Sequence, residues 1–168
     1  EHLGDFEKKN IQLIWQCGRN YYQRAQLALN QYNLPNVKLV DFIDRMDLGY
    51  AAADLIISRA GAGTISELAL IKKPVILVPS PNVAEDHQTR NAMALVEKNA
   101  AVLVRDPQTK AQLVDKAFDI LDHQDKMREL SKNIAQIAKP DSATKIAEEV
   151  IKLADKFASD ETLRYDRK

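Results

Sequence analysis

In the first half of the chain stands the segment Leu55-Ile56-Ile57-Ser58-Arg59-Ala60-Gly61-Ala62-Gly63-Thr64-Ile65-Ser66-Glu67. Three consecutive apolar residues lead into two glycines, and a stretch with helical character follows. Unbroken apolar runs are typical of parallel strands that helices bury on both faces. The segment therefore predicts a strand, a tight turn and a helix, which is the repeating unit of α/β domains with a parallel sheet.

The same alternation continues along the chain. The expected strands are Ile11–Trp15, Val37–Val40, Leu55–Ser58, Pro74–Val78 and Ala101–Val104. The expected helices are Tyr21–Gln31, Met46–Ala53, Thr64–Leu70, His87–Asn99, Ala111–Leu121, Asp125–Ala138 and Ser142–Phe157. This order predicts an α/β fold, with one Rossmann-like parallel sheet flanked by helices and extra C-terminal helices. We expect residues 1–158 to form one domain and residues 159–168 to form a frayed polar tail.

Composition excludes several classes of function. The chain has 168 residues, and its 24 basic and 24 acidic residues leave no net charge. Proteins that bind nucleic acid usually carry a basic excess, so we expect no nucleic acid partner. A single cysteine allows no internal disulfide, and the scattered histidines lack the spacing of metal ligands, so we expect no metal or cofactor. No apolar run has the length of a membrane span. The chain begins at Glu1 rather than Met, and we expect it to be part of a longer protein.

A doubly wound sheet binds ligands beyond the carboxyl ends of its strands. The loops at those ends cover residues 16–19, 41–46, 59–64 and 79–88. In the third loop, small residues and a helix start suit the approach of an anionic ligand. Thr64 and Glu67 there also have capping-box spacing, so the segment could be only a well-capped turn. Glu67 alternatively offers a carboxylate that could accept hydrogen bonds from two sugar hydroxyls.

The loop after the fourth strand opens a helix with polar residues. His87, Gln88 and Asn91 lie within about one helical turn and can share a face that suits sugar hydroxyls. The simpler interpretation is a solvated helix start with Asp86 as N-cap. His87 could act as a general base, but no neighbour in sequence orients it.

The first two loops carry weaker signals. Phe42, Ile43 and Met46 could pack on a flat aromatic base, although such residues more often fill a core. Gly18 permits a tight turn, and Cys17 reads as a small buried residue rather than a nucleophile. No Ser-His-Asp or Cys-His arrangement is evident, and no carboxylate pair suggests glycosidase chemistry.

Taken together and in this order, the four loops resemble the C-terminal, donor-binding domain of the MurG family, a GT-B glycosyltransferase family numbered 28. Residues 59–67 (RAGAGTISE) resemble its R-S/A-G-A-x-T-x-x-E segment, and residues 42–46 (FIDRM) resemble its F-I-x-x-M loop. Residues 86–92 (DHQTRNA) resemble the loop that ends in Q-x-x-N-A, and residues 15–18 (WQCG) resemble the W-Q-S/T-G turn. The resemblance covers nearly the whole chain.

The resemblance implies a role for each matching residue. Ile43 would meet uracil through its backbone, with Met46 nearby, and Glu67 would hold the ribose hydroxyls. The donor phosphates would meet the segment that begins at Arg59, with the residues Gly61, Ala62, Gly63 and Thr64, and would lie near Cys17 and Gly18. The N-acetylglucosamine hydroxyls would be read by Gln88 with His87, and Asn91 would support that loop.

Three positions depart from the family pattern. Cys17 replaces a Ser or Thr, which weakens a hydroxyl donor to phosphate. Gly63 stands where a larger apolar residue is common, and His87 stands where Gln is expected.

The resemblance also implies the activity. The family moves N-acetylglucosamine from UDP-N-acetylglucosamine to a lipid-linked N-acetylmuramyl-peptide in peptidoglycan synthesis, with inversion at the anomeric carbon. An N-terminal domain, which this chain lacks, would bind the lipid-linked acceptor and make the only membrane contact. We therefore expect a peripheral enzyme on the cytoplasmic side of the bacterial inner membrane. This chain alone would bind donor and be inactive, with no catalytic residue of its own.

Three alternatives stay open. The chain could be the donor subunit of a split N-acetylglucosaminyltransferase, or half of a UDP-N-acetylglucosamine epimerase. It could also be a binding module without catalysis, such as a flavodoxin-like regulator, which would need neither Glu67 nor the polar cluster at residues 87–91. A binding screen with UDP, UDP-N-acetylglucosamine, FMN and ADP distinguishes such a module from a domain that binds a sugar nucleotide.

Overall fold

The structure is a computed structural model that describes residues 2–32, 34–81 and 86–165, with side chains as far as Ala158. In chain order its helices and strands are α1 (Leu3–Lys8), β1 (Leu13–Gln16), α2 (Arg19–Leu29), β2 (Val37–Val40), α3 (Met46–Ala52), β3 (Ile56–Ser58), α4 (Ala62–Ile71), β4 (Val75–Leu77), α5 (His87–Val96), β5 (Val102–Leu103), the 3₁₀ helix η2 (Asp106–Gln108), α6 (Thr109–Asp122), α7 (Gln124–Ala135) and α8 (Ser142–Tyr165). All five expected strands are present, and each expected helix is present with shifted ends.

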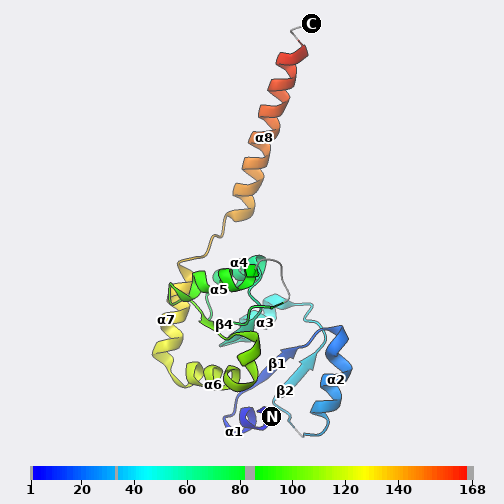
Figure 1. Cartoon of the computed structure of the whole chain (residues 1–168), viewed down its shortest axis with the longest axis vertical. Coiled ribbons are helices and arrows are strands. Elements are labelled where there is room, and N and C mark those ends of the chain that lie inside the picture. Colours follow the sequence, from blue (N-terminus) through cyan, green and yellow to red (C-terminus); the bar gives the residue numbers. More distant parts are fainter. Residues whose placement is uncertain (1, 33, 82–85, 166–168) are drawn as a thin grey trace.

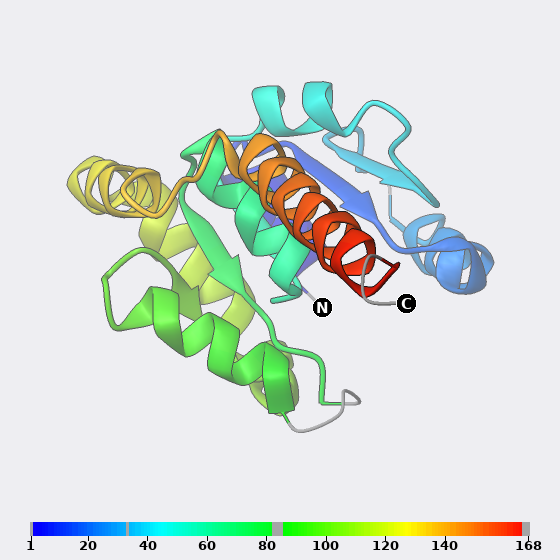
Figure 2. The same cartoon turned by 90° about the horizontal axis from the view of Figure 1, so that it is seen from above.

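The strands pair in parallel, as the alternation of strands and helices predicts. They form two sheets, however, rather than the single sheet expected. One sheet has the order β1-β2 and the other has the order β3-β4-β5. In Figure 2 the β1–β2 sheet and α2 lie to one side of the three-stranded sheet. Apolar runs predict strands, but they do not determine which strand edges hydrogen-bond to each other.

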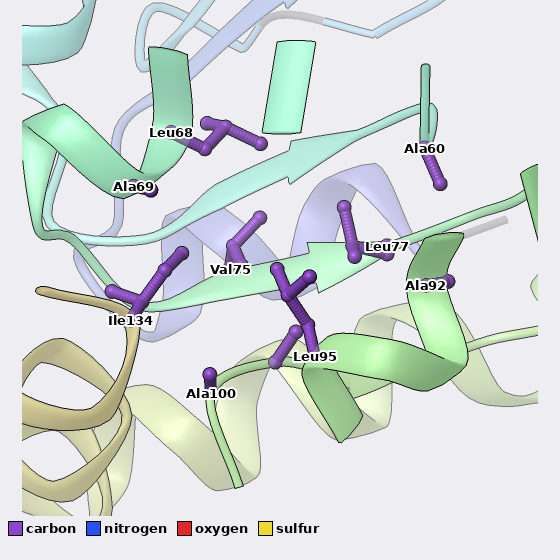
Figure 3. Packing of buried hydrophobic residues seen from close by; sticks show 10 residues of the cluster. Ala60, Leu68, Ala69, Val75, Leu77, Ala92, Leu95, Ala100 and Ile134 are labelled. Atoms are coloured by element: carbon purple, nitrogen blue, oxygen red, sulfur yellow. The ribbon is translucent and has the colours of Figure 1, made fainter. Parts of the chain in front are cut away.

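Strand β4 is the centre of the core. Its side chains alternate between the two faces of the sheet, as in any strand. On one face, Val75 and Leu77 pack with residues of α4, α5 and α7, and Figure 3 shows this cluster. On the other face, Ile76 and Val78 pack with residues of α6 and α7. This burial on both faces confirms that a helical layer covers each side of the sheet.

The outer strands are less covered than their sequences predict. We expected Leu55, Ile56 and Ile57 to be buried on both faces, but Ile57 is 41% exposed. The reason is its position, because β3 is the edge strand of its sheet and, among the described strands, pairs only with β4. On β1, Ile14 and Trp15 are also exposed, so apolar side chains of both sheets remain in contact with solvent.

A short N-terminal helix, α1, is present that the sequence pattern does not predict, and it packs against α6. Phe6 of α1 is buried and meets Phe118 of α6 edge to face, with ring centroids 5.1 Å apart. Lys9 follows α1, forms an ion pair with Asp122 at 2.6 Å and lies over the Phe118 ring. These contacts attach the start of the chain to α6, a helix of the three-stranded sheet.

The C-terminal helix is longer than expected and stands away from the domain. Helix α7 ends at Ala135, and α8 then runs from Ser142 to Tyr165, as Figure 1 shows. Helix α8 therefore continues past residue 158, where we expected the domain to end, as far as Tyr165, and residues 166–168 lie outside the described part. The exposed apolar residues of α8 are Ile146, Val150, Ile151, Leu153 and Phe157.

This contrast between core and C-terminal helix can be measured. Replacing the fully buried Ile76 by Ala should lower the free energy of unfolding by about 2–5 kcal/mol, because a cavity forms in the core. The matched change Ile146→Ala, at a side chain that is 65% exposed, should shift it by less than about 0.5 kcal/mol. Urea unfolding of both variants tests this, and equal losses would contradict an unpacked α8.

Candidate functional site

The carboxyl ends of the strands lie together in two groups. The loops after β1 and β2 are joined by hydrogen bonds from the amides of Cys17 and Gly18 to the carbonyls of Val40 and Asp41, each 3.1 Å long. The loops after β3 and β4 are joined by side chains described below. A hydrogen bond from Tyr50 of α3 to Glu67 of α4 is a side-chain contact between the groups.

At the start of α4 lie three backbone amides that have no hydrogen-bond partner among the described residues. Gly61 is the N-cap, and the first backbone bond of the helix runs from the Ile65 amide to the Gly61 carbonyl at 2.9 Å. The amides of Ala62, Gly63 and Thr64 therefore have no partner within the helix, and no side chain caps them. Such amides, at the positive end of a helix dipole, can bind a phosphate group.

The expected capping box at this helix does not form. Helix α4 begins two residues before Thr64, so Thr64 is the third residue of the helix and cannot be its N-cap. Glu67 is exposed, and its Oε2 atom accepts a hydrogen bond from the Tyr50 hydroxyl at 3.3 Å. Burial, the negative charge of Glu67 and this hydrogen bond together raise the pKa of Tyr50, so the phenol stays protonated as a donor near neutral pH.

Gln88 and Asn91 of α5 hold the turn that leads into α4. The Oε1 atom of Gln88 accepts hydrogen bonds from the Ala60 amide at 3.3 Å and from the Ser80 amide at 2.9 Å. Asn91 donates to the Ala60 carbonyl at 3.2 Å. Two backbone donors on one atom identify that atom as the oxygen, so a ligand would meet the amino group of Gln88. His87 is the first residue of α5 and is exposed.

Asp86 occupies the N-cap position of α5, as expected, but its side chain makes no capping bond. Its backbone is left-handed, with φ 55° and ψ 30°, whereas a capping Asp usually has an extended backbone. The residues before it, Asn82–Glu85, belong to the expected sugar-binding loop and lie outside the described residues.

Arg59 is directed to the neighbouring strand end. One terminal nitrogen of its guanidinium donates to the carbonyls of Val78 at 3.3 Å and Pro79 at 3.2 Å, and it also pairs with the carboxylate of Asp106. Arg59 therefore connects the loops that follow β3, β4 and β5. We expected it among the donor-binding residues, and here its guanidinium is engaged by protein groups.

Gly18 makes the turn after β1, as the sequence predicts. Its φ of 79° lies in the region that favours glycine. The neighbouring Cys17 is half-buried, and its thiol lies 3.5 Å from the Val40 carbonyl, a weak hydrogen bond between the two strand ends. The amides of Cys17 and Gly18 already donate to Val40 and Asp41. These two residues therefore hold the two loops together and offer no free amide to a ligand.

The loop after β2 forms a small apolar surface. Ile43 and Met46 are half-buried and lie against Gly49, whereas Phe42 is largely exposed. The Ile43 amide donates to the Gln16 side chain at 2.9 Å. The backbone group that the family resemblance assigns to a base thus has a protein partner in this structure.

The sequence pattern does not predict three contacts of this site, which Gln16 makes with Ile43, Asp106 with Arg59, and Tyr50 with Glu67. Gln16 and Asp106 both follow apolar runs, and the rule that ligands bind beyond strand ends could have identified Asp106 after the last strand. Tyr50 had no such signal, because it lies within a helix and meets Glu67 only through the tertiary fold.

Other binding features of the described residues lie elsewhere or are absent. A hollow of about 200 Å³ lies between α2 and β2, toward the amino end of β2, and none of the expected site residues lines it. Within the described ranges, no group of three or more His, Cys, Asp or Glu side chains could hold a metal ion. In the same part of the chain, none of the helices is both long and apolar enough to cross a membrane.

Residues 1–150 match the glycosyltransferase family 28 C-terminal domain. The chain belongs to glycosyltransferase family 28. It is 55% identical over 150 residues to a protein of Bacteroides thetaiotaomicron named UDP-N-acetylglucosamine–N-acetylmuramyl-(pentapeptide) pyrophosphoryl-undecaprenol N-acetylglucosamine transferase. That match covers 89% of this chain and 40% of that protein. A protein of the same name in Phocaeicola vulgatus is 53% identical over 158 residues, covering 94% and 42%.

A solved structure agrees with the family assignment. The crystal structure of MurG from Acinetobacter baumannii matches with a TM-score of 0.73 at 29% identity, covering 84% of this chain and 41% of that chain. The expected fold class, a parallel α/β domain of the GT-B type, is confirmed by this similarity. The chain spans about 40% of the length of the relatives that it matches.

Two glycines of the site should respond in opposite ways to alanine. Gly18→Ala forces a side chain into a left-handed conformation and should lower the free energy of unfolding by about 1–2 kcal/mol. Gly63→Ala lies within α4, where the added Cβ meets no atom within 4 Å, and should raise it by about 0.5–1 kcal/mol. Chemical denaturation distinguishes the two signs, and a destabilised Gly63→Ala would mean that this position is more crowded than the structure shows.

Proposed function

We propose that this chain is the donor-binding half of an inverting glycosyltransferase. The complete enzyme would transfer N-acetylglucosamine from UDP-N-acetylglucosamine to a lipid-linked N-acetylmuramyl-peptide in peptidoglycan synthesis. The observation that carries the proposal is the start of α4, where three unpaired amides lie one helical turn from the Glu67 carboxylate. A nucleotide diphosphate and its ribose need these two kinds of group. The names of the relatives described above support the same donor.

Different site residues would bind different parts of the donor. The amides of Ala62, Gly63 and Thr64 would hold the diphosphate, and Glu67, kept in place by Tyr50, would accept bonds from the ribose hydroxyls. The apolar surface of Ile43 and Met46 would receive the uracil, after the Ile43 amide has exchanged Gln16 for the base.

The sugar itself would lie near the start of α5. Gln88 would donate from its amino group to N-acetylglucosamine hydroxyls, with His87 beside it, while Asn91 would hold the Ala60 carbonyl behind them. Arg59, Gly61, Cys17 and Gly18 would shape the phosphate-binding turns from behind.

This half of the enzyme would stabilise the leaving group. As the acceptor hydroxyl attacks the anomeric carbon, negative charge develops on the departing UDP. The amides and the dipole at the start of α4 would stabilise that charge without having to reorganise. The acceptor, its general base and the membrane contact at the cytoplasmic face would belong to an N-terminal domain, so this chain alone would bind the donor and turn nothing over.

The 168-residue chain should bind UDP weakly. Closure of a cleft by a second domain would exclude water and strengthen binding, and this chain supplies one wall only. Glu67→Ala should weaken UDP binding about tenfold, because hydrogen bonds to a charged group are worth about 1.5–3 kcal/mol. Calorimetry with millimolar UDP provides the measurement.

Glu148→Ala serves as the matched control, since Glu148 is an exposed glutamate of α8 far from the site along the chain. It should leave the UDP affinity unchanged. If millimolar UDP produces neither heat nor a shift in melting temperature with the wild-type chain, this result would count against the proposal. A Glu67→Ala variant with reduced stability but normal UDP affinity would assign Glu67 a structural role only.

The apolar side of α8 indicates where the rest of the enzyme would pack. Ile146, Val150, Leu153 and Phe157 follow helical spacing and form one stripe, and all four are exposed. We propose that the N-terminal domain covers this stripe in the complete protein. Amides of residues 143–157 should then exchange hydrogen faster in this chain than in a longer protein that carries that domain. Equal and strong protection in both proteins would show that α8 packs within this domain.

A further inference from the structure

Arg59 and Asp106 form the one ion pair described for the strand ends of the three-stranded sheet. Arg59 follows β3, and Asp106 is the first residue of η2, three residues after the end of β5. The same guanidinium donates to the carbonyls of Val78 and Pro79, which follow β4. A single contact group therefore ties together the loops of all three strands.

The residue after Arg59 is held just as closely. Ala60 is fully buried, and both of its backbone polar groups are bonded, the amide to Gln88 and the carbonyl to Asn91. Gly61, the N-cap of α4, comes next. The position of the first amides of α4 thus depends on how firmly residues 59 and 60 are held.

Of these holding groups, Asp106 is the one that comes from the β5 loop. Its side chain is 35% exposed, and that of Arg59 is 55% exposed, so the pair lies at the surface and is partly screened by water. The guanidinium also satisfies two carbonyls that end a buried strand. Without Asp106, Arg59 could leave those carbonyls for solvent, since an exposed guanidinium has many hydrated positions of similar energy.

We propose that Asp106 is a positioning residue of the donor site. Its carboxylate holds the Arg59 guanidinium on the Val78 and Pro79 carbonyls, and this fixes the turn from β3 into α4 with its amides aligned for a diphosphate. Arg59 then acts as part of the framework rather than as a direct phosphate ligand. The inference rests on the proposed function, because it assigns a task at the same site.

The direction in which UDP affinity changes when Asp106 is removed distinguishes a positioning role from a direct effect of its charge. Asp106 is negative, and so is a diphosphate. If Asp106 acted on the ligand only through its charge, its removal would strengthen UDP binding, and it would also release the positive Arg59 to meet the phosphates. If Asp106 positions the turn, its removal weakens UDP binding even though a repulsive charge has gone.

The experiment measures UDP affinity of the full 168-residue chain by calorimetry. Asp106→Ala should weaken binding about threefold to tenfold, and Asp106→Asn should weaken it less, because its amide oxygen can still accept from Arg59. Asp122→Ala is the matched control, since Asp122 forms a similarly exposed ion pair with Lys9 away from the strand ends. Its affinity should equal that of wild type.

Hydrogen exchange of the free chain tests the same proposal without nucleotide. In Asp106→Ala, the amides of Ala60 and Ile65 should exchange several-fold faster, because their bonds to Gln88 and Gly61 open more often. The amide of Ile120 in α6 is the internal reference and should be unchanged. The control Asp122→Ala should leave the exchange of Ala60 and Ile65 as it is in wild type.

Each result decides between defined outcomes. Equal or tighter UDP binding by Asp106→Ala would overturn the positioning role, and so would unchanged exchange at Ala60 and Ile65. Faster exchange everywhere, including Ile120, would show general destabilisation, in which case Asp106→Asn must show the local effect alone for the proposal to stand. If the wild-type chain fails to bind UDP, the proposed function is contradicted. The exchange experiment would then still test whether Asp106 fixes the turn from β3 into α4.

Discussion

The structure depends on burial of strand β4 on both faces. Val75, Ile76 and Leu77 are fully buried, and their side chains enter two different clusters. Removing such side chains from water stabilises the fold by about 1.5–3 kcal/mol each. Because helices must cover both faces to achieve this, the layers around β4 are fixed, and the carboxyl ends of β3, β4 and β5 come together at one edge.

The candidate site is built on backbone polar groups at that edge of the sheet. Parallel strands end with backbone groups that no further strand can pair, and buried groups of this kind are costly unless they are bonded. Here side chains satisfy them, with Gln88 and Asn91 on Ala60 and Arg59 on Val78 and Pro79. The amides at the start of α4 remain unpaired, so the same framework that protects the strand ends presents donors to a ligand.

Two sets of exposed apolar side chains are unusual for a domain that stands alone. One is the stripe on α8, and the other comprises Ile14 and Trp15 of β1 and Ile57 of β3. Exposed apolar patches often mark surfaces that contact another part of a protein. The stripe agrees with a chain that covers about 40% of its relatives.

Local sequence determined the elements and the places to examine. Apolar runs and helical spacing located every strand, and the glycines at positions 18 and 61 marked turns that lead into α2 and α4. These features depend on neighbours in the chain, so a pattern can reveal them. The same pattern placed the start of α4 two residues late and suggested a capping box that does not form, since Thr64 lies inside the helix.

Tertiary structure alone decided which side chains hold the site. Tyr50 reaches Glu67 across 17 residues, Gln88 reaches Ala60 across 28, and Arg59 reaches Asp106 across 47. None of these pairs has a spacing that helical or strand geometry imposes, because each partner arrives with a different element. The division of the strands into two sheets and the free course of α8 were hidden for the same reason. Pairing of edges and faces depends on what packs beside them, and a single sequence pattern does not record it.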